Sequence, residues 1–199
     1  MRKIVVAPDS FKGSLTSQQA TRIMVEVFSQ ELPDTEVIPC PLADGGEGTH
    51  AVLAPLLADE QCLIESARFI GLNLPQMQSL DILNRGSSPL GGAILNGLDA
   101  GRREFVIGLG GSAINDGGLG MLMALGMKAF NEQGREIEPN LSGLLSLHSM
   151  DISTLDPRLA KTHITILSDV ESTLCGKNGA TTVYGPQKGL QASDVERVD

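Results

Sequence analysis

Aromatic side chains are scarce in this sequence. Phe, Tyr and Trp together make up 3% of the 199 residues, and Trp does not occur at all. Since 41% of the residues are hydrophobic and 20% are charged, we expect a packed core rather than disorder. That core must consist of Leu, Ile, Val, Ala and Met. The length suits one sizeable α/β domain or two small ones.

Positively charged residues are also few. Lys and Arg number 15 against 24 Asp and Glu, which gives a formal net charge of −9. This balance argues against non-specific binding to nucleic acid or to an anionic membrane. It does not argue against a phosphorylated ligand, because a glycine loop and a few lysines can bind a phosphate locally whatever the net charge of the chain.

Cysteine is scarce and scattered. Cys40, Cys62 and Cys175 are odd in number and widely spaced, as expected for a reducing cytosol without a disulfide framework. They form no zinc-type spacing with the three histidines. The sequence also shows no secretory leader and no apolar run of membrane length. We therefore expect a cytoplasmic protein.

Strands and helices alternate from the start of the chain. A β-branched strand is expected over residues 3–7, followed by a helix with Thr16 and Gln19 at capping-box spacing, and a second strand over 35–38. This order is the β-α-β unit of a parallel sheet. The helix carries an apolar stripe that we expect to face a core: Ala20, Ile23, Met24, Val27 and Phe28.

The same alternation continues further along. Strands are expected over 61–65, 104–109 and 163–167, a helix begins near Pro89, and a hairpin turns near residues 131–134. The predicted fold class is α/β, with largely parallel sheets and flanking helices.

The expected division of the chain has three parts. Residues 1–60 form an N-terminal α/β segment of a discontinuous domain, and residues 61–189 form a second α/β domain. Residues 190–199 begin a further helix, because Ser193 and Glu196 have capping-box spacing. Within the first part, Pro55 falls inside a helical stretch, where proline costs about 3 kcal/mol, so that region is expected to be irregular or altered.

The least ordinary stretch is Gly108–Gly118. It follows an apolar strand and packs five glycines together with Ser112, Asn115 and Asp116. Glycines at this density let the backbone approach a ligand and turn N–H groups toward an anion, which indicates a phosphate-handling loop. The expected phosphate-binding residues are Gly110, Gly111, Ser112, Asn115 and Gly117.

Two standard nucleotide motifs do not account for this loop. The Walker pattern is missing. Gly108, Gly110 and Ala113 match the dinucleotide fingerprint formally, but the polar turn that follows interrupts the helix which that fingerprint needs. A nicotinamide-dependent oxidoreductase is therefore only a remote alternative.

Carboxylates recur at the ends of the predicted strands. In open parallel sheets, ligands bind outside those ends, so we expect the four aspartates on one rim to handle metal and protons. With Glu47 beside them, Asp44, Glu47 and Asp116 are the expected Mg²⁺ ligands. The plainer alternative is that the aspartates cap helices and form turns. The four are Asp9, Asp44, Asp116 and Asp169.

Two lysines stand next to glycines. Lys12 and Lys188 each have the reach to contact a phosphate oxygen or the carboxylate of an acid, although an isolated surface lysine is the plainer alternative. We expect Asp9, Ser10 and Lys12 to contact substrate or phosphate.

Together, these motifs resemble the bacterial glycerate kinases of the glycerate 2-kinase type. The matching segments are Ala7–Leu15, Pro41–Thr49, Gly108–Gly118 and Tyr184–Gly189, with Ser168–Val170 in addition. The resemblance implies two α/β domains and ATP-dependent phosphorylation of D-glycerate to 2-phosphoglycerate, with Mg²⁺ and ATP. It implies no nucleic-acid or membrane partner and fixes no oligomeric state.

Roles in that reaction follow from the chemistry of the matching residues. We expect Asp169, Asp116 and Lys188 to be catalytic, with Asp169 accepting the hydroxyl proton and Lys188 neutralising charge.

Members of the family extend further at the C-terminus and carry an additional strand-containing stretch between the positions of Leu53 and Gln61. The expected protein is therefore an N-terminal part of such a kinase with an internal deletion. An inactive or ligand-binding fragment is the alternative.

Overall fold

The computed structural model describes residues 2–199. The chain opens with strand β1 (Arg2–Val6), helix α1 (Ser17–Glu31) and strand β2 (Thr35–Pro39). β1 and β2 pair in parallel, with Ile4 opposite Val37. The predicted β-α-β unit is confirmed.

The start of α1 follows from its capping residues. The Thr16 Oγ1 atom accepts a hydrogen bond from the Gln19 amide at 3.2 Å, and the Gln19 side chain accepts one from the Thr16 amide at 2.9 Å. This is the predicted capping box. The helix ends at Glu31, two residues before Pro33.

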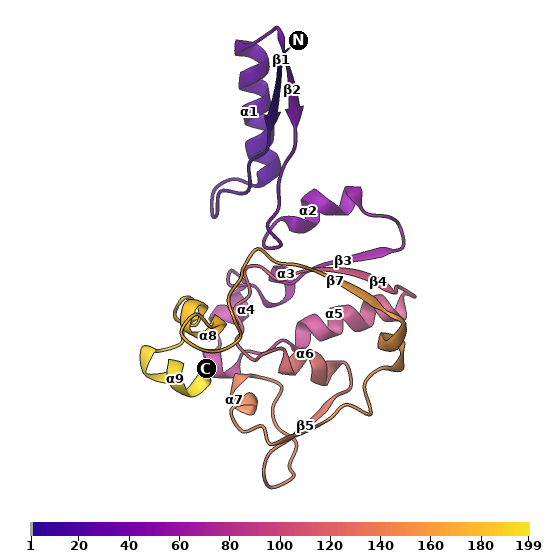
Figure 1. Ribbon diagram of the computed structural model, residues 1–199, viewed down its shortest axis with the longest axis vertical. Helices are drawn as coiled ribbons and strands as arrows, with labels where there is room; N and C mark the ends of the chain where they lie inside the picture. The colour runs from indigo at the N-terminus through magenta and orange to yellow at the C-terminus, as the bar shows by residue number, and fades with distance from the viewer. Residues whose placement is uncertain (1) are drawn as a thin grey trace.

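The apolar stripe of α1 does not face a core along its length. Ala20 is buried, but Ile23 is 45% exposed, Val27 51% and Phe28 36%. Figure 1 shows β1, α1 and β2 standing at one end of the molecule, away from the other sheets. Two strands are too narrow a sheet to cover the helix, so the expectation that the whole stripe is buried is wrong.

The main sheet is built from strands far apart in the sequence. β3 (Gln61–Glu65), β4 (Glu104–Gly108) and β7 (His163–Leu167) run parallel in the order β3-β4-β7. Helices α5 (Ser88–Asp99) and α6 (Leu119–Ala124) lie together below this sheet in Figure 1. The three predicted strands are confirmed.

The largest hydrophobic core lies between this sheet and its helices. Phe105 and Ile107 of β4 and Leu90, Ile94 and Leu98 of α5 are almost fully buried. Burial of aliphatic side chains at this scale is the main force that holds the sheet to its helices.

Short elements complete the structure. Met127–Phe130 leads into the expected turn, in which the Asn131 amide donates to the Arg135 carbonyl at 2.9 Å. The strand before that turn, β5, pairs along its length with β6, antiparallel. The remaining elements are α2 (Thr49–Leu53), α3 (Ala67–Ile70), α4 (Pro75–Gln78), β5 (Lys128–Phe130), α7 (Leu141–Leu144), β6 (Ser149–Asp151), α8 (Ala180–Tyr184) and α9 (Val195–Val198).

Two local predictions meet a different outcome. The expected helix around Pro55 is split into α2 and a 3₁₀ turn over Ala54–Leu56, in which proline near the first position loses no helical hydrogen bond. At the other end, α9 is preceded by Asp194, which makes no side-chain cap. Ser193 lies inside a 3₁₀ turn, so the predicted Ser193–Glu196 capping box is wrong.

The strands of residues 1–60 and those of residues 61–189 belong to separate sheets. The division into domains stays a prediction. Within residues 2–199, no helix has both the length and the apolar character needed to cross a membrane.

Candidate functional site

The four strand-end aspartates do not share one sheet edge. Asp9 and Asp44 follow strands of the β1-β2 sheet, whereas Asp116 and Asp169 follow β4 and β7. The expectation of one rim is therefore wrong, because the two β-α-β units form separate sheets. The loops after the strands nevertheless meet.

Two glycine-rich loops make that meeting possible. The Gly110 amide donates to the Gly45 carbonyl at 3.0 Å. A Cβ atom on Gly108 would lie 2.4 Å from the Gly45 oxygen, and one on Gly110 would lie 2.7 Å from the Gly46 Cα atom. No side chain fits at such a distance, so these glycines let the loop after β2 rest on the C-terminal edge of the main sheet.

The same contact weakens the dinucleotide interpretation. Such a loop passes directly from strand to helix, with its glycines against the cofactor. Here Gly108 and Gly110 lie against another loop, and α6 begins only at Leu119.

A cavity of about 770 Å³ opens where the two loops meet. This volume is within the range of small-molecule sites. Its lining includes Ser10, Gly46 and Gly111, so three of the sequence motifs contribute to it. The acidic and basic side chains of the lining are Lys12, Asp44, Glu47, His50, Glu65 and Arg68.

Two of the three expected Mg²⁺ ligands, Asp44 and Glu47, line this cavity. Asp44 Oδ1 accepts a hydrogen bond from the Gly46 amide at 2.8 Å, and Glu47 Oε2 accepts one from the Asn73 side chain at 2.9 Å. Within residues 2–199, the second oxygen of each carboxylate has no such partner. Mg²⁺ in kinases is held by one or two carboxylates together with waters and phosphate oxygens, which this pair would satisfy.

Glu65 is a site residue that the sequence reading missed. Only 3% of it is exposed. Its two oxygens accept hydrogen bonds from the Gly48 amide at 3.0 Å and the His50 amide at 2.7 Å. A carboxylate at a helix start is favourable, so Glu65 fixes the loop that carries Asp44 to the first turn of α2. It ends a predicted strand, the same position that drew attention to the aspartates.

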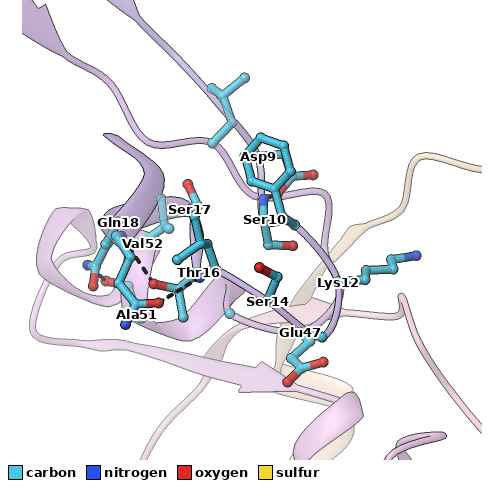
Figure 2. Close-up of a pocket in the computed structure, with 16 residues that line it drawn as sticks. Asp9, Ser10, Lys12, Ser14, Thr16, Ser17, Gln18, Glu47, Ala51 and Val52 are labelled. Atoms are coloured by element: carbon cyan, nitrogen blue, oxygen red, sulfur yellow. Dashed lines mark hydrogen bonds between the residues drawn. The ribbon is translucent and has the colours of Figure 1, made fainter. Parts of the chain in front are cut away.

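A smaller cavity of about 270 Å³ lies beside the first. Asp9, Ser10 and Lys12 line it, and Ser10 and Lys12 line the larger cavity as well. Figure 2 shows the Lys12 side chain extending away from Thr16 and Gln18. The predicted contacts of the first loop are thus gathered at one place.

Asp116 lies outside both linings. It is fully buried. Its Oδ2 atom accepts from the Ser87 amide at 2.7 Å, the Ser87 hydroxyl at 2.7 Å and the Gly120 amide at 3.0 Å, and its Oδ1 atom accepts from the Gly118 amide at 3.2 Å. In the described part of the chain, no three acidic, His or Cys side chains are grouped to hold a metal ion. Asp116 is therefore not brought together with Asp44 and Glu47.

Lys188 is engaged with the backbone of the glycine loop. Its Nζ atom donates to the Ile114 carbonyl at 2.7 Å and lies 3.4 Å from the Ser112 hydroxyl. Arg85 in turn donates to the Lys188 carbonyl at 2.8 Å. Burial lowers the pKa of Lys188, and the negative charge of Asp116 opposes that shift. The expected lysine lies at the loop, with its ammonium group already hydrogen-bonded.

The remaining predicted residues are placed apart from the cavities. The Asn115 side chain donates to the Thr181 hydroxyl at 3.1 Å. Gly117 has a φ of 59°, a left-handed conformation that favours glycine. Asp169 is exposed, two residues beyond β7, and lines neither cavity. Loop residues Ser112–Asp116 are thus held by protein groups, while Gly111 lines the larger cavity.

Comparisons with known proteins give a consistent result. The model of the glycerate kinase family matches residues 4–58 and 55–199. A glycerate kinase of Haemophilus influenzae is 37% identical over 99% of this chain, and a glycerate 2-kinase of Escherichia coli K12 is 36% identical over 99%. A crystal structure of a Salmonella typhimurium LT2 protein assigned as glycerate kinase 2 superposes with a TM-score of 0.79, at 39% identity over 100% of this chain and 61% of its own.

Length separates this chain from those relatives. It spans 59% of the Haemophilus protein and 58% of the Escherichia protein. The two family-model segments meet at residues 55–58, within the stretch where a deletion was expected. The Haemophilus alignment extends over 222 positions, more than the 199 residues here, so this chain lacks residues that the relative has.

Proposed function

Since the chain belongs to the glycerate kinase family, we propose that its larger cavity serves the ATP-dependent phosphorylation of D-glycerate to 2-phosphoglycerate. One observation carries the proposal: the first three of the segments that match the family, Ala7–Leu15, Pro41–Thr49 and Gly108–Gly118, all contribute to the lining of a single cavity of about 770 Å³. That cavity combines cationic and acidic side chains, as transfer of a phosphoryl group to a hydroxy acid requires.

Asp44 and Glu47 would hold the Mg²⁺ ion of Mg-ATP. When bound there, the ion would supply neutralisation of the phosphate charge. Lys12, on the same cavity wall, adds a cation from the loop after β1. Gly111, with a φ of 71°, carries no side chain, and only the Ala67 Cβ atom lies near the position that a Cβ would take, at 3.6 Å, so a ligand can approach the backbone closely.

Asp116 and Lys188 act on this site through the glycine loop. Both side chains are hydrogen-bonded to backbone or side-chain groups of residues 87–120. Their proposed role is to hold the loop in the shape that seats the Gly45 segment, because neither lines either of the two cavities described above. They differ in this from the catalytic roles expected from the sequence.

Asp169 is our proposed base for the glycerate hydroxyl. It follows Leu167, whose carbonyl oxygen lies against Gly45, next to Asp44 in the chain. Its exposed carboxylate has no hydrogen-bond partner within residues 2–199 and is therefore free to accept a proton.

The test is a coupled assay of ADP release with D-glycerate and Mg-ATP, with phosphorus NMR to identify the phosphorylated hydroxyl. Formation of 2-phosphoglycerate, lost in Asp169→Asn, is the expected result. Asp34→Asn, at another exposed aspartate, is the matched control and should leave turnover unchanged. Binding of both ligands without turnover would establish the ligand-binding alternative, and binding of neither would refute the proposal.

A further inference from the structure

Two cations of the larger cavity have no ion-pair partner within residues 2–199. Arg68 of α3 and Lys12 of the loop after β1 both line it. Among residues 2–199, the ion pairs involve only Lys3 and Arg158 as the basic partners. The Arg68 guanidinium also makes no hydrogen bond to any of these residues. A cation left unpaired at a cavity is available to an anionic ligand.

None of the acidic side chains of the cavity forms an ion pair with Arg68 within residues 2–199. Both oxygens of Glu65 accept backbone amides at the start of α2. One oxygen of Glu47 accepts from Asn73, on the wall that also carries Arg68. Arg68 therefore lines the cavity without an ion-pair partner among residues 2–199, although acidic residues share the lining.

The backbone beneath Arg68 is fixed to the glycine loop at both ends. The Ser66 amide donates to the Gly108 carbonyl at 2.9 Å, and the Ala113 amide donates to the Ile70 carbonyl at 2.7 Å. Arg68 thus projects from a short helix that is pinned to the main sheet. A rigid base suits a residue that orients a ligand.

The two cations differ in what they recognise. The Arg68 guanidinium is a planar fork that pairs with a carboxylate through two parallel hydrogen bonds, whereas a lysine ammonium is a point charge. Lys12 stands on an exposed loop, next to Gly13 with a φ of 74°. Arg68 is therefore the residue suited to recognising a planar carboxylate, and Lys12 is the residue suited to neutralising charge on a phosphate.

We propose that Arg68 binds the carboxylate group of the small hydroxy acid and so selects acids over neutral polyols. The assignment rests on the proposed function and adds to it the residue that recognises the acid. It concerns a residue outside all the motifs that suggested the family, since Arg68 lies between the second and third of them.

The experiment measures binding, so it does not depend on turnover. D-Glycerate, glycerol and Mg-ATP are each titrated into the full chain by isothermal titration calorimetry, with wild type, Arg68→Gln and Arg68→Lys. Arg22→Gln, an exposed arginine of α1 outside the cavity, is the matched control. Circular dichroism checks that each variant is folded.

Arg68→Gln should weaken D-glycerate binding at least tenfold and leave Mg-ATP binding within twofold. Arg68→Lys, which keeps the charge and loses the fork, should fall between wild type and Gln. Glycerol should bind more weakly than D-glycerate to wild type and equally to all variants. Two results would refute the role of Arg68 and leave the proposed function intact. One is equal D-glycerate affinity in wild type and Arg68→Gln, and the other is a loss of Mg-ATP affinity as large as the loss of D-glycerate affinity. A wild-type chain that binds no D-glycerate would overturn the proposed function as well.

Discussion

Asp116 gives the sharpest test of how the glycine loop is held. Its carboxylate accepts four hydrogen bonds in a fully buried position, three of them at Oδ2. Replacement by Ala leaves the donors on Ser87, Gly118 and Gly120 unpaired. Each buried donor left unpaired costs about 1–3 kcal/mol, so we expect Asp116→Ala to lose about 4 kcal/mol or more. That is a large part of the roughly 5–15 kcal/mol that stabilises a domain.

Asp116→Asn should cost less, about 1–3 kcal/mol. Its amide oxygen can replace Oδ2 and keep three hydrogen bonds, while its NH₂ group faces the Gly118 amide, another donor. The order of stability should therefore be wild type, then Asn, then Ala.

Urea unfolding followed by circular dichroism measures the free energy of unfolding by linear extrapolation. The matched control is Asp34→Ala, at an exposed turn position before β2, which should change the free energy by less than about 0.5 kcal/mol. If Asp116→Ala also stayed within about 0.5 kcal/mol of wild type, the argument from buried donors would be refuted.

Three further predictions are tested by unfolding measurements or by amide hydrogen exchange. Ser87→Ala removes a hydroxyl that donates to Asp116 and accepts from the Met121 amide, each at 2.7 Å, and should cost about 2 kcal/mol; an effect below about 0.5 kcal/mol would contradict this. Thr16→Ala removes the cap of α1 and should cost about 1 kcal/mol, seen as faster amide hydrogen exchange in residues 17–31; unchanged exchange there would count against the cap. The pKa of Lys188 is lower in the folded chain than its ordinary value of 10.5, so the unfolded chain binds more protons between the two pKa values. The stability of wild type relative to Lys188→Gln should therefore rise as pH approaches 10.5, and a difference independent of pH would refute the burial argument.

The strands and the first helix could be predicted because their signals are local. β-Branched runs over residues 104–109 and 163–167 favour extended backbone whatever their neighbours are. Thr16 and Gln19 satisfy each other within one turn. Such interactions need no knowledge of the rest of the chain.

Burial was less predictable, because it depends on what lies opposite. The spacing of Ile23, Val27 and Phe28 is that of a core-facing stripe, yet these side chains are 36–51% exposed. The period shows which side chains share a helix face, but whether a sheet covers that face is decided by strand pairing. β2 pairs only with β1, and the main sheet forms from later strands.

Only some of the residues expected at the site come together, because this too depends on contacts between distant segments. Ser10, Lys12, Asp44 and Glu47 do line one cavity. Glu65 was missed although it ends a predicted strand, because a single glutamate there has no distinctive neighbours. Arg68 was missed because an isolated arginine carries no local signal. Only the fold shows that it lines the cavity and has no ion-pair partner among residues 2–199.

The sequence alone determined that Gly108–Gly118 is a specialised loop after a strand, since no ordinary core or turn needs that composition. The tertiary structure decided what its residues do. Gly108 and Gly110 permit contact with Gly45 and Gly46, and Gly111 lines the cavity. The hydrogen bonds of the Asp116 carboxylate hold the loop. The sequence shows directly that a glycine has no side chain. Whether a ligand or another loop approaches that glycine depends on contacts between segments more than 60 residues apart.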